Sequence, residues 1–217
     1  MVTFFIGLVD YFLAKVIRYA SWYEKHETIT KLHISVAIKM TIAKFLNETV
    51  VLVMVNLDSD GWYSRGNLVL DAHILMLCFT FFTPIVYIFN FEGLIKKAEM
   101  HWEELKGENC ELTQREANEL CEGRDVDVSD NLSSLFSYVM TCLFYSPIIP
   151  QAIPICLVGT FLNYWAYKYM LLRKHNHPKM LSDLLPMFFS HFLPWIIFFQ
   201  SLAFIWFASL MYGKEKQ

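Results

Sequence analysis

Long apolar stretches separated by polar segments dominate the pattern of the chain. Apolar runs cover Val2–Ala20, Ile34–Leu57, Leu68–Asn90 and Met187–Met211, and the stretch Ser134–Lys174 contains two more. Each has about 20 residues, the length of a helix that crosses roughly 30 Å of hydrocarbon. The pattern therefore predicts an all-α, polytopic transmembrane helix bundle with about six membrane-spanning helices.

A proline-rich corner divides the stretch Ser134–Lys174 into its two runs. Pro147, Pro150 and Pro154 lie between them, and proline cannot continue the hydrogen-bond ladder of a helix. The corner is too apolar for an ordinary loop in water, and the second run ends in basic residues. These features predict a transmembrane hairpin that turns at one membrane face and returns to a basic anchor at the other.

The first run has a signal peptide as its alternative. A signal peptide begins with basic residues, which precede a short apolar centre and a small-residue cleavage site. Here the basic residues Lys15 and Arg18 come late in Val2–Ala20. A retained helix is therefore the expectation.

Composition excludes several classes of protein. The chain has 55% hydrophobic and 18% charged residues, whereas a soluble domain carries about a quarter charged residues. The net charge of −3, without a basic stripe, argues against a nucleic-acid partner. The five cysteines have neither zinc spacing nor the close pairs of a disulfide scaffold, so no metal site and no cofactor are expected.

The polar segment 91–131 separates two groups of apolar runs. It holds twelve acidic and five basic residues. This divides the chain into three transmembrane helices in 1–90, a charged linker in 91–131, and three transmembrane helices with a short tail in 132–217. Inside the linker, Lys96–Leu105 predicts a short helix, and the residues TQRE from Thr113 to Glu116 fit a capping box that opens another.

Lysine and arginine are distributed unevenly between the predicted loops. Ten lie in one set of loops, which includes the linker, and three lie in the opposite set. Basic residues concentrate on the cytoplasmic side of membrane proteins. We therefore expect an integral protein of the plasma membrane or an organelle membrane, with a cytoplasmic linker and both termini on the non-cytoplasmic side.

The second run carries the strongest candidate for a functional site. Lys44 and Glu48 are four residues apart and share a helix face with Asn47. Charges at mid-membrane cost several kcal/mol and normally face a bundle interior or a wet cavity. Two interpretations stay open: a path for ions or lipid headgroups, or a Lys44–Glu48 pair that neutralises itself between packed helices.

The third run adds polar groups and a helix break. Pro84 removes one ladder bond, which predicts a kink near Thr80. Asp71 and His73 lie near the non-cytoplasmic interface, where solvation explains them. The chain has no recognisable nucleophile setting and no glycine-rich phosphate loop, so we do not expect an enzyme.

Polar residues also occur on the return run of the hairpin. Asn163, Tyr164 and Lys168 occupy one face. Hydrogen bonds between helices and anchoring at the membrane interface account for them.

Several segments, in their order along the chain, resemble a known family. They are WYEKHETITK, SVAIKMTIAKFLNETVVLVMVN, PIVYIFN, LTQREANELCEG and FYSPIIPQAIPICLVGTFLNYWAYKYMLLRK. The chain resembles the C-terminal membrane module of the OSCA/TMEM63 (CSC1-like) family of osmo- and mechanosensitive cation channels, which is related to anoctamins and TMC proteins. The most specific part is the proline-cornered hairpin with its tyrosine-rich, basic end.

The resemblance implies a pore and candidate residues for it. The six helices would be the fourth to ninth of about eleven, with a non-cytoplasmic start, and the pore would run through the first four runs. The implied lining or gating residues are Lys44, Asn47, Glu48, Asp71, Thr80 and Pro84. The family's N-terminal helices, large cytoplasmic domain and last helix have no counterpart, so we expect a piece of a longer product or a shortened relative.

The leading hypothesis is a partial pore module of a calcium-permeable, mechanosensitive or osmosensitive cation channel. Its expected partners are the lipid bilayer, permeant cations, and other membrane subunits or the missing part of a longer chain. One alternative is a non-conducting structural subunit of a membrane complex. Another is lipid scrambling through the same groove, as in anoctamins.

Overall fold

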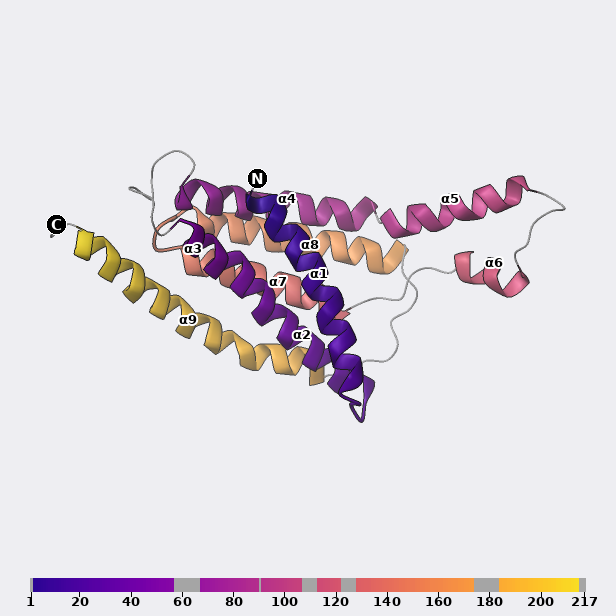
Figure 1. Ribbon diagram of the computed structural model, residues 1–217, viewed down its shortest axis with the longest axis horizontal. Helices are drawn as coiled ribbons and strands as arrows, with labels where there is room; N and C mark the ends of the chain where they lie inside the picture. Colours follow the sequence, from indigo (N-terminus) through magenta and orange to yellow (C-terminus); the bar gives the residue numbers. More distant parts are fainter. Residues whose placement is uncertain are drawn as a thin grey trace.

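The computed structural model describes residues 2–56, 67–89, 91–106, 113–121, 128–173 and 184–214. These residues form helices and short turns and contain no strand, which confirms the all-α class (Figure 1). The elements are α1 (Val2–Tyr23), α2 (Ile29–Phe45), the π-helix η1 (Leu46–Val51), α3 (Leu52–Val55), α4 (Leu68–Phe89), α5 (Phe91–Leu105), α6 (Gln114–Cys121), α7 (Val128–Tyr145), α8 (Ala152–Arg173) and α9 (Leu184–Lys214).

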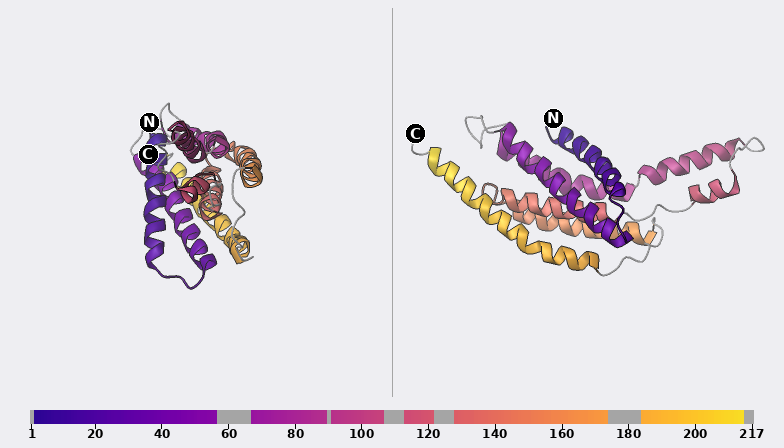
Figure 2. Two further views of the ribbon diagram at one scale, coloured as in Figure 1. Left: turned by 90° about the vertical axis from the view of Figure 1, so that its right-hand side faces the viewer. Right: turned by 60° about the horizontal axis from the view of Figure 1, so that its bottom comes forward.

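Within the described residues, each predicted apolar run is a helical rod. The second run is one continuous rod made of α2, η1 and α3. Successive rods run in alternating directions, and α5 and α6 extend beyond one end of the bundle (Figures 1 and 2). Two helices of the described chain are long and apolar enough to cross a membrane: the one that includes α4, and Ser190–Leu210 in α9.

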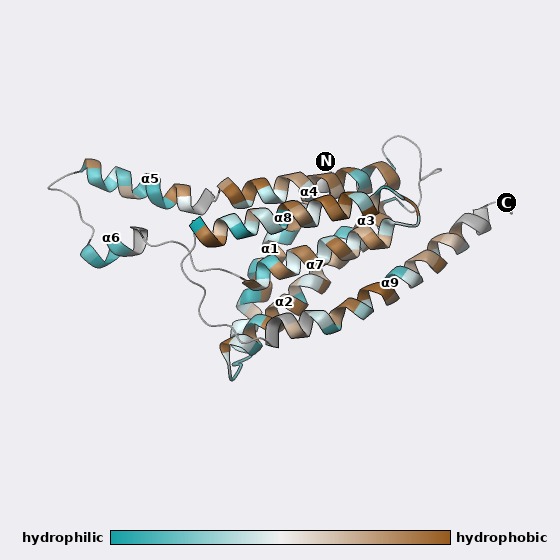
Figure 3. Ribbon diagram, turned by 180° about the vertical axis from the view of Figure 1, so that it is seen from behind, coloured by the Kyte–Doolittle hydropathy of each residue, from teal (hydrophilic) through white to brown (hydrophobic). Residues whose placement is uncertain are grey.

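Polar side chains lie inside this bundle and large apolar side chains lie on its outside. Phe12, Phe82, Leu157 and Ile205 are all more than half exposed. The buried polar or charged residues are Asp10, Ser21, Thr41, Lys44, Asn47, Glu48, Thr49, Asn56, Thr80, Ser129, Ser133, Ser137 and Thr141. In contrast to the bundle, α6 and much of α5 are hydrophilic (Figure 3). An apolar outside around a polar inside is the distribution that a hydrocarbon environment favours.

The predicted hairpin is formed by α7 and α8 and the turn between them. The amide groups of Ile148 and Ile149 both donate to the carbonyl of Tyr145, at 3.0 and 2.9 Å, and both side chains are buried. The corner is shorter than predicted, because Pro154 belongs to the first turn of α8. Proline is tolerated there because first-turn amides have no acceptor within the helix.

The first four residues of α7 lie inside the predicted charged linker, which was expected to end at residue 131. Val128 and Leu132 pack against α2 around Ala37, which is fully buried. The ring of His33 lies 2.7 Å from the hydroxyl of Ser129. This packing makes Asp130 part of a bundle helix and corrects the boundary drawn from charge alone.

The predicted helix in the linker is longer at its start than expected, since α5 begins at Phe91 rather than Lys96. The predicted capping box is present at α6. The amide of Thr113 donates to Glu116 Oε2 at 2.8 Å, and the amide of Glu116 approaches Thr113 Oγ1 at 3.4 Å. Reciprocal bonds of this kind satisfy the first amides of a helix.

Acidification is expected to weaken α6. The hydrogen bond from the Thr113 amide stabilises the carboxylate and lowers the pKa of Glu116. A depressed folded-state pKa means that the cap is intact at neutral pH and is lost as the pH falls through that pKa. Hydrogen exchange of the α6 amides, corrected for intrinsic rates, should show falling protection. Glu116→Gln keeps an oxygen that can accept from the Thr113 amide, and it should remove the pH dependence of this protection. An unchanged pH dependence in Glu116→Gln would contradict the role of the Glu116 carboxylate in the cap.

Candidate functional site

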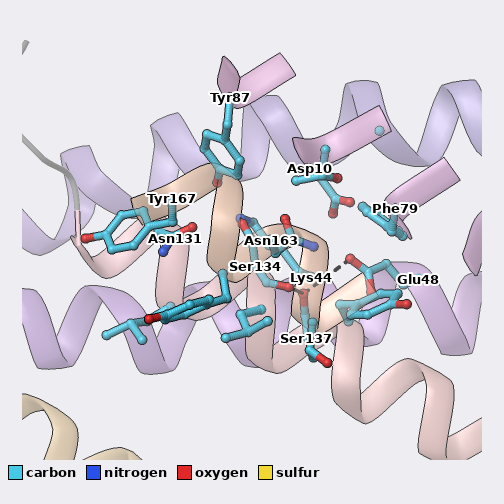
Figure 4. A pocket seen from close by; sticks show the side chains of 17 residues that line it. Asp10, Lys44, Glu48, Phe79, Tyr87, Asn131, Ser134, Ser137, Asn163 and Tyr167 are labelled. Atoms are coloured by element: carbon cyan, nitrogen blue, oxygen red, sulfur yellow. Dashed lines mark hydrogen bonds between the residues drawn. The ribbon is translucent and has the colours of Figure 1, made fainter. Parts of the chain in front are cut away.

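A cavity of about 310 Å³ lies between α1, α2, η1, α4, α7 and α8 (Figure 4). Its polar lining residues are Asp10, Lys44, Glu48, Thr83, Asn131, Ser134, Ser137, Thr160 and Asn163. Aromatic rings complete the wall, among them Phe79, Tyr87, Tyr138, Tyr164 and Tyr167. Carboxylates, hydroxyls and amides therefore face one space in the middle of a largely apolar bundle.

Glu48 is the most buried charged residue of this lining. It is 1% exposed and accepts hydrogen bonds from the hydroxyls of Thr141, at 2.8 Å, and Ser137, at 3.4 Å. Both donors come from α7, so that helix fixes the direction of the carboxylate. The sequence pattern predicts Glu48 on the inner face of its helix, and the structure places it in the cavity lining.

Glu48 also lies within η1, a turn wider than an α-helix. A π-helix shifts the hydrogen bonds by one residue, and such turns often occur at functional sites. The carbonyl of Thr49 accepts a hydrogen bond from the hydroxyl of Tyr145, at 3.1 Å. This bond from α7 provides a partner for a backbone carbonyl inside the irregular turn.

Lys44 lines the cavity but does not neutralise Glu48. Its ammonium group donates to Asp130 Oδ1 at 3.0 Å and to Ser134 Oγ at 2.7 Å. Lys44 contacts Asp130 and Ser134, Glu48 contacts Ser137 and Thr141, and Thr49 contacts Tyr145. Residue numbers rise together in both helices, so the rod that contains α2 runs parallel to α7. Helical side chains lean toward the N-terminus of their helix, which directs the long lysine chain back to the first turns of α7.

Asn47 supports the site from behind the lining. Its amide donates to Asp10 Oδ1 at 2.9 Å and to the carbonyl of Ile6 at 3.1 Å, and it is 9% exposed. The amide thereby joins α1 to η1 and holds the Asp10 carboxylate. In the sequence Asp10 stands out only as an interruption of the first run, yet the structure places it in the cavity lining.

The predicted residues of α4 lie outside the cavity lining. The lining face of α4 consists of Phe79, Thr83 and Tyr87, spaced four residues apart. Thr80 and Pro84 each follow a lining residue by one position and are buried. Asp71 lies in the first turn of α4, where its amide donates to the carbonyl of Asn67 at 3.1 Å. These three predicted residues are therefore not part of the cavity lining.

Thr80 instead joins three helices through Tyr138. Its hydroxyl lies 2.8 Å from the carbonyl of Met76 and 2.8 Å from the hydroxyl of Tyr138, which lies 2.9 Å from the carbonyl of Ile155. Two hydroxyl hydrogens serve three contacts, so one contact lacks a hydrogen at any moment. The cluster lies where Pro84 leaves the Thr80 carbonyl without its ladder partner.

The polar face of α7 was not predicted from the sequence. Asp130, Ser134, Ser137 and Thr141 follow each other at intervals of four, three and four residues, which is one helix face. That spacing was the available signal. Asp130 lies in the acidic segment that was interpreted as a linker. It was therefore not considered together with Ser134, Ser137 and Thr141, and their shared helix face was missed.

The polar residues of α8 behave differently from the expectation. Asn163 donates to the carbonyl of Gly159 at 2.9 Å, within its own helix, rather than to a neighbouring one. Lys168 lies over the rings of Tyr164 and Trp165, at 5.7 and 5.4 Å from their centroids. Tyr164 lines the cavity and is 59% exposed, so the lining continues to the outside of the bundle.

In the part of the chain that the structure describes, no group of three or more His, Cys, Asp or Glu side chains could hold a metal ion.

The chain matches no protein-family model, no curated protein and no solved structure. Chemically, carboxylates, hydroxyls and amides around one space can replace part of the hydration of a cation bound there.

Proposed function

We propose that this chain forms part of the ion path of a calcium-permeable, mechanosensitive or osmosensitive cation channel of the OSCA/TMEM63 type. The observation that carries the proposal is the Glu48 carboxylate, which is buried in a π-helical turn and lines a cavity inside a bundle with an apolar surface. The six rods cross the membrane in this proposal, with the linker on the cytoplasmic side.

Electrostatics supports a path for cations rather than anions. Asp10 and Glu48 bring carboxylates to the lining, and Lys44 brings a positive charge that has Asp130 as its partner. Intramembrane ionisable residues are expensive and normally mark ion pathways or buried pairs. Two carboxyl groups and one ammonium group line the cavity, and this ratio favours cations over anions as the permeant species.

Two irregular helices next to the cavity provide a means of gating. The π-helix η1 interrupts the α2–α3 rod beside Glu48, and Pro84 interrupts α4. Both interruptions lower the cost of bending, because the backbone bonds there already depart from the α-helical ladder. Membrane tension would favour a wider bundle, and bending at these points would widen the path.

The proposal is tested by recording from the purified full chain in liposomes under controlled membrane pressure. We expect a cation current that rises with tension. Glu48→Gln keeps the size of the side chain and one accepting oxygen but removes the carboxylate, and it should lower the calcium-to-chloride permeability ratio roughly tenfold. The matched control is Glu104→Gln on α5, whose side chain is 64% exposed.

Each outcome of the recording has a separate meaning. A correctly folded chain that carries no tension-activated current would overturn the channel proposal. A normal current with the same permeability ratio in Glu48→Gln would remove Glu48 from the path.

Lipid scrambling is a second candidate, favoured by the exposure of Tyr164. A polar lining that reaches the outside of a bundle offers lipid headgroups a way across the membrane. Acceleration of fluorescent-lipid exchange in the same liposomes, without an ionic current, would support scrambling. A rate equal to that of protein-free liposomes would exclude it.

A further inference from the structure

The lining contains a positively charged residue, which is unfavourable for a path that conducts cations. Lys44 shares the cavity with Asp10 and Glu48 and is 8% exposed. An unpaired ammonium group there would repel every cation that passes, and at low dielectric this repulsion acts over several ångströms. Lys44 forms its ion pair with Asp130 and not with Asp10 or Glu48, so the carboxylate that compensates it directly comes from outside the lining.

Asp130 lies where such a group is needed. Its Oδ1 accepts from the Lys44 ammonium at 3.0 Å, and its Oδ2 lies 3.4 Å from the guanidinium of Arg18. Ser134 also accepts from Lys44, at 2.7 Å, but a hydroxyl carries no charge. The first turn of α7 thus supplies the negative charge, and the second turn supplies only a hydrogen-bond partner.

The position of Asp130 separates it from the ions themselves. Asp130 does not line the cavity, whereas Lys44, Ser134 and Glu48 do. Its side chain is 31% exposed, and that of Arg18 is 38% exposed, so the pair lies toward one end of the bundle. Asp130 reaches the cavity lining through its ion pair with Lys44, so we expect it to act on permeation through Lys44.

We propose that Asp130 is a specificity-determining residue that keeps the path cation-selective by pairing with Lys44. This inference rests on the proposed channel function. Loss of the Asp130 charge leaves the Lys44 ammonium uncompensated in the lining, and the path then discriminates less against anions. Arg18 approaches the second oxygen of the Asp130 carboxylate and is a positioning residue in this arrangement.

The test is a set of permeability ratios measured with the full chain in liposomes, with potassium and chloride gradients under membrane tension. Asp130→Asn should lower the potassium-to-chloride ratio roughly tenfold, because one charge becomes uncompensated. Lys44→Met should keep or raise the ratio. The double variant Lys44→Met/Asp130→Asn should return it to the wild-type range, since both charges are gone.

The conservative variant Asp130→Glu protects the test against misfolding of Asp130→Asn. It keeps a carboxylate beside both Lys44 and Arg18, so its ratio should stay in the wild-type range. Asp71→Asn removes a carboxylate that lies outside the cavity lining and should leave the ratio unchanged.

The outcomes distinguish this inference from the channel proposal. Suppose that the wild-type chain conducts. An unchanged permeability ratio in Asp130→Asn would then overturn the role of Asp130 and leave the channel proposal intact. A low ratio that persists in the double variant Lys44→Met/Asp130→Asn would do the same. Absence of current from the folded wild-type chain would overturn the channel itself.

Discussion

Replacing Gly159 by alanine is expected to destabilise the bundle by about 2–4 kcal/mol, the sum of overpacking and lost hydrogen bonds. A Cβ atom at this position of α8 would lie 2.7 Å from Cζ and 2.9 Å from Cε1 of Tyr138. The ring has little room to move, since Tyr138 is 3% exposed. Its displacement would also break the contacts of its hydroxyl with Thr80 and with the carbonyl of Ile155.

The measurement is reversible unfolding in mixed detergent micelles. Gly7→Ala on α1 is the matched control, because a Cβ there meets nothing within 4 Å. That control should be neutral or stabilising by up to about 1 kcal/mol, from helix propensity. The double variant Gly159→Ala/Tyr138→Phe lacks the Tyr138 hydroxyl oxygen, which is the atom closest to the added Cβ. Its loss of unfolding free energy should therefore be less than the sum for the two single variants. Strict additivity would contradict the proposed contact.

The helical rods of this protein could be predicted from its sequence because the signals for them are local. The length and hydropathy of each run are contained in about 20 neighbouring residues, and the prolines mark the corner of the hairpin. The capping box at Thr113 is local as well, and it is present in the structure. The boundary at α7 was wrong because its cause is not local: Val128 and Leu132 pack on α2, about 90 residues away.

The site was predicted in part, and the reason lies in how each helix is rotated about its axis. The second run has few polar residues, so their shared face identified Lys44, Asn47 and Glu48 together. The third run is apolar nearly all round, so no pattern shows which face it turns inward. Thr80 and Pro84 were therefore chosen for their chemistry, whereas the structure turns Thr83 and Tyr87 toward the cavity.

The π-helix at Glu48 has no sequence signal of its own. The segment LNETVV contains neither proline nor glycine, and its propensities do not distinguish a π-turn from an α-turn. Its irregular backbone receives a partner from another element, the hydroxyl of Tyr145. The structure of this turn therefore depends on tertiary contacts that only the folded bundle supplies.

Tyr145 is accordingly the position where truncation should cost most. It is fully buried, and its ring packs against Phe144 at 5.2 Å and Phe207 at 6.4 Å between centroids. Tyr145→Ala leaves a large cavity and is expected to destabilise the bundle by about 3–5 kcal/mol. Tyr145→Phe removes only the hydrogen bond to the Thr49 carbonyl and should cost about 1–2 kcal/mol. Tyr11→Ala, at a side chain that is 59% exposed, is the control and should change stability by less than about 0.5 kcal/mol.

The two Tyr145 variants also separate packing from the support of η1. Because Tyr145→Phe keeps the ring, its effect should concentrate in the turn that carries Glu48. Hydrogen exchange should quicken at the amides of residues 46–52 more than in α8, whereas Tyr145→Ala should quicken exchange throughout the core. If Tyr145→Phe leaves exchange in η1 unchanged, the hydroxyl does not hold the π-turn. The hydrogen bonds from Ser137 and Thr141 would then be the contacts by which α7 orients the Glu48 carboxylate.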